Sequence, residues 1–307
     1  MNRSPSLSIL VPVYNFGVEA MVRGLSDQCT ALGLDFEVRV YDDGSDARWK
    51  AANQAVRGIP GVVYKELERN IGRSRIRNLL AIEAGKTLLL FLDCDSGIPD
   101  GMFIANYLAH AGTPVVVGGT TYAAHRPARA YRLHWKVGKA REQRSAARRS
   151  RHPYRSITLN NILIARDAFL AVMLDESIRT YGHEDTKFGQ QLKEKGIAIR
   201  HIENPVAHNG LNTNADFLGK TREAQRNLHR LYASGGHGGQ TGVVRMFRTM
   251  ERYGLKVPFT LAYGLFRPII EGTLEAGTAP LFFFDLYKVF HFIRNGRESG
   301  QPVQGKS

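Results

Sequence analysis

The sequence predicts an α/β protein with a mostly parallel central sheet, flanked by helices and followed by a helical C-terminal extension. Two observations predict the sheet. Apolar segments of strand length alternate with segments of helix length over the first hundred residues, and the run from Leu88 to Leu92 is wholly apolar. Such a run is typical of a strand buried on both faces of a parallel sheet. Beyond Asp216, helix patterns replace strand patterns, which predicts the extension.

The elements can be justified in chain order. Strands are expected at residues 8–13, 37–41, 62–66, 88–92, 115–118, 157–165 and 197–202, and helices at 20–32, 48–57, 74–84, from 167 and at 186–195. Strands that alternate with helices in this way form parallel sheets joined by crossover connections. Residues 205–214 are expected to form a loop, and the glycine-rich segment 234–242 divides the later helices.

Composition places the chain among globular proteins. Of its 307 residues, 43% are hydrophobic and 23% are charged, and its two cysteines suggest no disulfide framework. The N-terminus has one early arginine and too short an apolar stretch for a signal peptide, and no window reaches the ~18 apolar residues of a membrane span. We therefore expect a cytoplasmic protein that does not span the membrane.

The charge of the chain is strongly positive and unevenly distributed. The formal net charge is +14, and between Arg126 and Arg155 eleven Lys and Arg residues stand against one acid, Glu142. This stretch is expected to be partly helical, around residues 131–147. Nucleic acid, an anionic membrane leaflet and a phosphorylated substrate would all suit such a surface, and so would a solvated basic face without a partner.

Two carboxylates follow the most apolar strand. Ligands of parallel sheets bind beyond the carboxyl ends of the strands, where Asp93 and Asp95 emerge. Strand alternation would point both to one side and Cys94 away from it. Two hard oxygen ligands suit Mg²⁺ or Mn²⁺ carrying a phosphate, although an Asp-x-Asp segment can also be an ordinary turn.

Polar residues also follow the first two predicted strands. Pro12, Tyr14 and Asn15 end the first strand, and Asp42 and Asp43 end the second. Carboxylates gathered at neighbouring strand ends repel one another unless a cation or a hydrogen-bonding ligand lies between them. A nucleoside with a metal-bound diphosphate meets both needs. The alternative is an ordinary Asp-Gly turn.

Further candidates follow along the chain. Arg73, Arg75 and Arg77 stand near the start of a predicted helix, where they could hold a diphosphate or simply be solvated. Glu184 and Asp185 precede another helix; Asp185 could accept a proton from a hydroxyl or only cap the helix. His208 follows a short strand and could complete the metal site or be structural.

Taken in order, these segments resemble the family-2 glycosyltransferases, inverting enzymes of the GT-A (Rossmann-like) fold that use nucleotide sugars. The resemblance rests on SILVPVYN, YDDGSD, NIGRSRIRN, FLDCDS, LNNILIARDAF and GHED, and extends from Ser8 to about His208. It implies a GT-A catalytic domain over residues 1–215, which carries the basic insertion 126–155. Residues 216–307 would then form a helical region that associates with membrane or packs on the catalytic domain.

The resemblance also implies roles for matching residues. Asp93 would contact the ribose or the metal, and Asp95 would bind the Mn²⁺ or Mg²⁺ that bridges the diphosphate. Asp185 would be the general base, and Glu184 would position the acceptor or the sugar. The remaining matches would lie around the donor, four at the nucleoside and one near the sugar: Pro12, Tyr14, Asn15, Asp42 and Asn161.

The acceptor is left open, because relatives lack the basic insertion in this form. The aromatic and basic segment 280–294 could lie in a membrane interface or pack as a helix. Together with the charge, it favours a peripheral position on the inner face of the membrane and an acceptor that is lipid-linked or part of a surface polysaccharide. Two other functions remain open. A nucleic-acid-binding protein would leave the carboxylates unexplained, and a nucleotidyltransferase would leave the Glu184-Asp185 pair unexplained.

Overall fold

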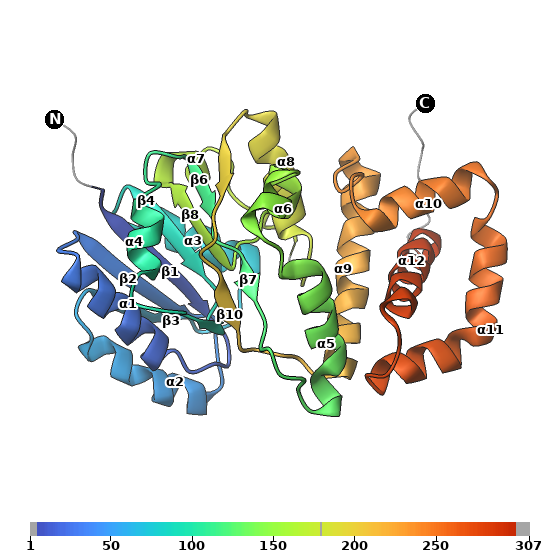
Figure 1. The fold of residues 1–307 in the computed structure, drawn as a ribbon, viewed down its shortest axis with the longest axis horizontal. Helices are drawn as coiled ribbons and strands as arrows, with labels where there is room; N and C mark the ends of the chain where they lie inside the picture. Colours follow the sequence, from blue (N-terminus) through green and yellow to red (C-terminus); the bar gives the residue numbers. More distant parts are fainter. Residues whose placement is uncertain (1–4, 179, 299–307) are drawn as a thin grey trace. The chain divides into compact units, whose positions relative to one another are not determined.

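The computed structural model describes residues 5–178 and 180–298 (Figure 1). These residues form two compact units whose segments alternate along the chain. Unit 1 consists of the described residues within 1–123, 142–179 and 188–210, and unit 2 of those within 124–141, 180–187 and 211–307. Residues 299–307 of the predicted C-terminal region lie outside the described part. The predicted division at residue 215 stays a prediction.

Unit 1 is built on a seven-stranded sheet with the strand order β3-β2-β1-β4-β8-β6-β9. All of its strands run parallel except β8, which is antiparallel to both neighbours. The expected mostly parallel sheet is therefore confirmed. Its strands are β1 (Leu7–Val13), β2 (Phe36–Asp42), β3 (Val62–Glu66), β4 (Leu88–Leu92), β6 (Val115–Val117), β8 (Asn161–Ala165) and β9 (Ile199–His201).

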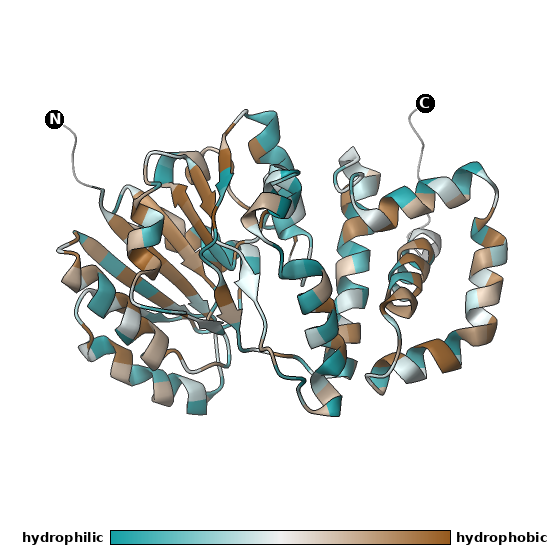
Figure 2. Cartoon of the chain, in the orientation of Figure 1, coloured by the Kyte–Doolittle hydropathy of each residue, from teal (hydrophilic) through white to brown (hydrophobic). Residues whose placement is uncertain are grey.

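Helices cover both faces of this sheet, as expected. One face packs on α1 (Glu19–Ala31) and α4 (Phe103–Leu108). The other packs on α3 (Arg73–Glu83), α7 (Arg166–Leu170) and the later turns of α8 (Glu184–Glu194). Alternate residues of β4 enter the two cores, which is why this strand is wholly apolar and why the sheet interior is brown in Figure 2. The helix α2 (Ala47–Asn53) follows β2 and continues as a short 3-10 helix, Gln54–Gly58.

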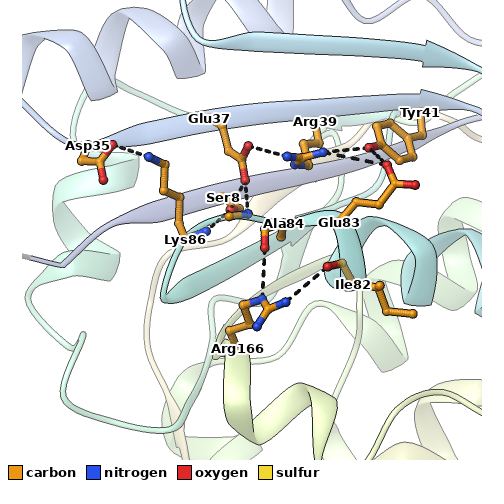
Figure 3. Close-up of polar contacts among 11 residues, drawn as sticks. Ser8, Asp35, Glu37, Arg39, Tyr41, Ile82, Glu83, Ala84, Lys86 and Arg166 are labelled. Carbon is orange, nitrogen blue, oxygen red and sulfur yellow. Dashed lines mark hydrogen bonds and ion pairs between the residues drawn. The ribbon is translucent and has the colours of Figure 1, made fainter.

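A polar network lies on the α3 face of β1 and β2 (Figure 3). Glu37 accepts a hydrogen bond from the Ser8 hydroxyl at 2.6 Å and pairs with Arg39 at 2.9 Å. Arg39 also donates to the Tyr41 hydroxyl at 2.9 Å, which in turn donates to Glu83. Burial would raise the pKa of Glu37, but the hydrogen bonds from Arg39 and Ser8 outweigh it and hold this pKa below its ordinary value.

Two details of the predicted strands are wrong. The strand expected at 157–165 begins only at Asn161, because its partner strand β4 ends at Leu92, which pairs with Asn161. The loop expected at 205–214 contains β10 (Val206–His208), which forms a second, three-stranded sheet with β5 (Ser96–Gly97) and β7 (Thr120–Thr121). Strands this short show no detectable periodicity.

The basic stretch 126–155 is divided between the units. Its first part contains α5 (Arg132–Val137) in unit 2, and its last part contains α6 (Ala146–Ser150) in unit 1. Short 3-10 and π turns at Arg129–Tyr131, Gly138–Glu142 and Pro153–Ser156 complete it. The expected partial helicity is confirmed, as two separate helices.

Unit 2 is a helical assembly, which confirms the predicted helical C-terminal region. It contains α9 (Asn214–Gly235), α10 (Gly242–Arg252), α11 (Lys256–Glu275) and α12 (Leu281–Glu298), with a core of side chains from all four. In Figure 1, α12 lies between α9 and α11. Within the described residues, no helix is both long and apolar enough to cross a membrane.

The aromatic segment 280–294 does not offer its apolar face to a membrane. Tyr287, Val289, Phe290 and Phe292 of α12 are all buried, because α9, α10 and α11 pack around this helix. Of its large apolar side chains, Phe282 is the one that is mostly exposed, at 59%. The segment therefore forms the core of unit 2, and the expectation that it lies in a membrane interface is wrong.

Candidate functional site

The loops at the carboxyl ends of β1 and β2 are joined by hydrogen bonds. The backbone N–H of Asn15 donates to the Ser45 hydroxyl, and the backbone N–H of Asp46 donates to Asn15 Oδ1, both at 2.8 Å. Asn15 has a φ of 52°, a left-handed conformation that asparagine tolerates better than most residues. Together these bonds fix the shape of the edge at which ligands of such sheets bind.

Asp43 and Gly44 attach a third loop to this edge. Both carboxylate oxygens of Asp43 accept backbone N–H groups, from Ile71 at 2.7 Å and from Gly72 at 3.3 Å. Gly44 has a φ of 74°, and a Cβ added there would lie 2.6 Å from the backbone nitrogen of Asn70. Asp43 thus has a structural role that the sequence did not reveal, while its predicted contact with a donor stays a prediction.

Asp42 is fully buried at the end of β2. Its Oδ1 accepts the Ser45 N–H at 2.7 Å, and within the described residues its Oδ2 has no hydrogen-bond partner. A buried carboxylate oxygen without a partner is energetically unfavourable, which makes it a candidate acceptor for a ligand N–H or O–H. Tyr14, from the neighbouring loop, is 53% exposed and offers an aromatic face, whereas Pro12 lies within β1 opposite Tyr41.

Asp93 is held by two arginines of α3. Its Oδ1 accepts a hydrogen bond from buried Arg77, and its Oδ2 accepts one from Arg73 at 3.3 Å. Burial would raise the pKa of Asp93, but the two guanidinium charges outweigh it and keep the pKa below its ordinary value. Arg77 belongs to the predicted group of arginines, and its place four residues after Arg73 puts both on one helix face.

The second carboxylate is arranged differently from the prediction. The chain turns after Leu92, with the Ser96 N–H bonded to the Asp93 carbonyl at 3.1 Å, so strand alternation does not govern Asp93 and Asp95. Asp95 instead faces β10, where the His208 Nδ1 lies 3.5 Å from Asp95 Oδ2. Burial, together with the charge of Asp93, raises the pKa of Asp95. Cys94 packs against the hydrophobic core, as expected.

Asp95 and His208 fit a divalent cation that a diphosphate also ligates. A carboxylate and an imidazole are both ligands for Mn²⁺, and they lie close enough here to reach one ion. Gly210 permits this arrangement, because a Cβ there would lie 2.1 Å from Asp95 Oδ2. No group of three or more His, Cys, Asp or Glu residues suited to a metal occurs among the described residues, so other ligands would come from substrate and water.

Two other predicted residues make structural contacts. Asn161 is fully buried; its Oδ1 accepts the Tyr107 hydroxyl at 2.6 Å, and its Nδ2 donates to the carbonyls of Gly119 and Asn204, both at 2.8 Å. Arg75 points toward Glu176, with its Nε 3.6 Å from Glu176 Oε2, and it does not contact Asp93 as Arg73 does. Their predicted donor contacts stay predictions.

Glu184 and Asp185 form the start of α8, in the part of this helix that belongs to unit 2. Asn227 of α9 braces the preceding segment, and its Nδ2 donates to the carbonyl of Tyr181 at 3.1 Å. Gly182 has a φ of 101°, and a Cβ there would lie 2.5 Å from the Ala224 side chain. The pair is thus presented at a helix N-terminus, where the helix dipole favours ionised carboxylates.

Comparisons with known proteins found a family model and several solved structures that are similar to this chain. The model of glycosyl transferase family 2 matches residues 8–181. Three solved structures, each with a TM-score of 0.49, are similar: Staphylococcus aureus TarS (17% identity, 75% of this chain and 40% of that chain), S. aureus TarS 1-349 with UDP-GlcNAc (15%, 97% and 93%), and Mycobacterium tuberculosis glucosyl-3-phosphoglycerate synthase with Mn²⁺, UDP and glucosyl-3-phosphoglycerate (17%, 77% and 82%). A comparison with curated proteins found no match.

The family model spans more than half of the chain, and it covers the strand ends that carry Asn15, Asp42, Asp93 and Asp95. It also includes the three loops that Asp43 and Gly44 hold together. The resemblance drawn from the sequence motifs is confirmed, and the chain belongs to glycosyl transferase family 2.

Proposed function

We propose that this glycosyltransferase moves a sugar from a nucleoside-diphosphate sugar to a hydroxyl of a saccharide or lipid-linked acceptor, with inversion at the anomeric carbon. The observation that supports it best is the group of carboxylates at the ends of β2 and β4. In the sheet, β2 and β3 follow on one side of β1, and β4 lies on the other side of β1, so the order of the strands switches between β1 and β4. In open α/β sheets, ligands bind at such a switch point. Asp42, Asp93 and Asp95 all lie at this edge.

The donor we propose is a UDP-sugar. The unpartnered Oδ2 of Asp42 is an acceptor and, when ionised, cannot donate, so it suits a base that presents a ring N–H, as uracil does. Exposed Tyr14 offers a stacking surface beside it. A cation held by Asp95 and His208 would supply charge neutralisation for the leaving diphosphate. Arg73, near the same carboxylates, adds a positive charge at the start of α3.

The chemical step needs a base and a leaving group. We propose that Asp185 takes the proton of the acceptor hydroxyl as its oxygen bonds to the anomeric carbon. The bond from that carbon to the diphosphate oxygen breaks at the same time, and the nucleoside diphosphate leaves with the electron pair. Attack opposite the leaving group inverts the configuration. Glu184 would position the acceptor or the sugar.

The proposal is tested by incubating the protein with Mn²⁺ or Mg²⁺ and each nucleotide sugar in turn, and by measuring release of the nucleoside diphosphate. We expect release from a UDP-sugar and little from donors with other bases. Release of pyrophosphate instead would identify a nucleotidyltransferase. A salt-dependent shift with DNA or RNA, without any turnover, would favour a nucleic-acid-binding protein.

Asp185→Asn tests the base. We expect kcat to fall by about 10²- to 10⁴-fold, because an amide cannot accept the proton, while donor affinity stays the same. Asp216→Asn is the matched control: it removes an acid from the first turn of another helix of unit 2, α9, and should leave kcat unchanged. A fully active Asp185→Asn protein would exclude this mechanism.

Asp95→Ala tests the metal site. We expect donor affinity to fall by about tenfold or more and turnover to lose its response to added Mn²⁺, because the cation would lose one of its two protein ligands. Titration of the UDP-sugar by calorimetry, with and without a chelator, measures the affinity, and the rate of nucleoside diphosphate release at increasing Mn²⁺ measures the response of turnover. Asp100→Ala, at an exposed position a few residues later, is the control. Unchanged metal dependence in the Asp95 variant would refute the site.

A further inference from the structure

Helix α11 carries a stripe of exposed apolar side chains on its outer face. Val257, Leu261, Leu265 and Ile269 follow one another at four-residue intervals and are 57%, 70%, 75% and 61% exposed. Phe266, beside them, is 54% exposed. Residues four apart in a helix lie on one side, so these side chains form a continuous row along the helix. Single exposed apolar residues are ordinary, but a continuous row marks a docking surface.

This stripe contains no charged side chain. The other exposed positions within residues 257–269 are Pro258, Ala262, Gly264 and Pro268. The single charged residue of that span, Arg267, is partly buried, and its Nε donates to Glu271 at 3.0 Å. In contrast, the inner side of α11 contributes Tyr263, Ile270 and Leu274 to the core of unit 2. The helix is therefore apolar on both its inner and outer faces.

Basic residues precede the stripe in the chain. From Gly242 to Ile270 the chain has five cations, Arg245, Arg248, Arg252, Lys256 and Arg267, and one acid, Glu251. The acid pairs with Lys256 at 2.6 Å. The exposed side of α10 carries Arg245, Arg248 and Arg252, and Tyr253, the residue after the helix, is 64% exposed. Cations, an interfacial aromatic residue and an apolar stripe are the composition of helices that lie in membrane interfaces.

We propose that α11 docks on an anionic lipid bilayer, lying along its surface with the stripe among the headgroups and upper acyl chains. The cations of α10 would then face the lipid phosphates. A second copy of this chain is a poorer occupant, because a symmetric interface would bring the same cations of both copies together in a chain of net charge +14. A bilayer with anionic headgroups complements both the stripe and the charge. This inference does not depend on sugar transfer.

Vesicle flotation with the full chain tests the proposal. The vesicles are phosphatidylcholine alone or an equimolar mixture with phosphatidylglycerol. We expect the wild-type chain to float with the anionic vesicles and to bind neutral vesicles more weakly. Leu261→Glu/Leu265→Glu should lower binding to anionic vesicles by about tenfold or more, because two charges would enter an apolar layer. Both side chains are at least 70% exposed, so the variant keeps its core.

The matched control is Ile82→Glu/Met102→Glu, which places the same charges at isolated apolar positions of unit 1 that are 53% and 60% exposed. It should bind vesicles as the wild type does. The proposal is overturned if the wild type does not bind anionic vesicles, or if the stripe variant and the control bind these vesicles equally well. Sedimentation velocity tests the alternative occupant, a second copy of this chain. If the wild type is a dimer, the stripe variant is a monomer and neither binds vesicles, α11 is a dimer interface and the proposal is overturned. Sugar transfer to a soluble acceptor should be the same in all three proteins.

Discussion

At the scale of single residues, Gly44 determines how the loops of the candidate donor site meet. A side chain there would be strained by the φ of 74° and would collide with the backbone of residues 69 and 70. We predict that Gly44→Ala lowers the free energy of unfolding by about 3 kcal/mol, the sum of left-handed strain and overpacking. Gly33→Ala, with a φ of 61° and open space, should lower it by about 1 kcal/mol. Urea denaturation measures both, and equal losses would contradict the argument.

Residue identity could be predicted from the sequence better than residue role. The acids and amides at the strand ends could be located because apolar runs end there, and ligand sites follow strand ends. That Asp43 binds the backbone of a distant loop depends on a contact between segments 28 residues apart in the chain. Which oxygen of Asp42 stays unpartnered depends on the conformation of the turn that brings the Ser45 N–H to the other oxygen. The pairing of Arg77 with Asp93 likewise depends on how α3 packs beside β4.

At the scale of elements, Arg149 attaches α6 to the sheet. It is buried, and its guanidinium donates to four carbonyls, those of Val117 and Gly118 at 2.9 Å, of Ile202 at 2.7 Å and of Arg144 at 3.1 Å. We predict that Arg149→Met lowers the free energy of unfolding by about 3 kcal/mol, because these acceptors would be left without partners. Arg148→Met removes the same charge from an exposed position and should change stability by less than about 0.5 kcal/mol. Similar losses in the two variants would show that net charge, not the carbonyl contacts, is what matters.

Element types were predictable where the pattern is long. The strands β1 to β4 and the helices α1 and α3 appear within a residue or two of their predicted positions, because continuous apolar runs and helical spacing specify them. The small sheet of β5, β7 and β10, which carries His208, was not predictable, since its strands have only two or three residues each. Nor was the burial of Arg149, which is one of eleven cations in an evenly basic stretch.

At the scale of the whole molecule, the two units differ in how protons affect them. In unit 2, burial lowers the pKa of His183 and of His291 from 6.5 to about 4. His291 on α12 faces Glu271 and Arg267 of α11 and Arg222 of α9. In unit 1, hydrogen bonds and ion pairs lower the pKa of Glu37 and Glu83 below 4.5 despite burial. These shifts act over different ranges of pH.

The histidines make unit 2 the more acid-sensitive part. As the pH falls below 6.5, these histidines become protonated in the unfolded chain, whereas in the folded chain they stay neutral until the pH is about 4. The free energy of unfolding therefore falls as the pH drops toward about 4. Glu37 and Glu83 of unit 1 keep their full contribution to stability above pH 4.5 and lose it only as the pH falls through their lowered folded-state pKa values. His201 of unit 1 also has a lowered pKa, whereas in the described part of unit 2 the pKa is lowered at His183, His229 and His291.

We therefore predict that α12 loses protection from hydrogen exchange before β1 and β4 do, as the pH falls from 6.5 to 4.5. Exchange measured by mass spectrometry and corrected for the intrinsic pH dependence resolves the two units. His291→Gln should reduce the loss of stability of α12 over this pH range by up to about 3 kcal/mol, the free energy that corresponds to the pKa shift of His291, because glutamine does not titrate. His152→Gln, at an exposed position, should not alter that response. Simultaneous loss of protection in α12 and β4 would contradict this order, because it would mean that the histidines of unit 2 do not set the onset of acid unfolding.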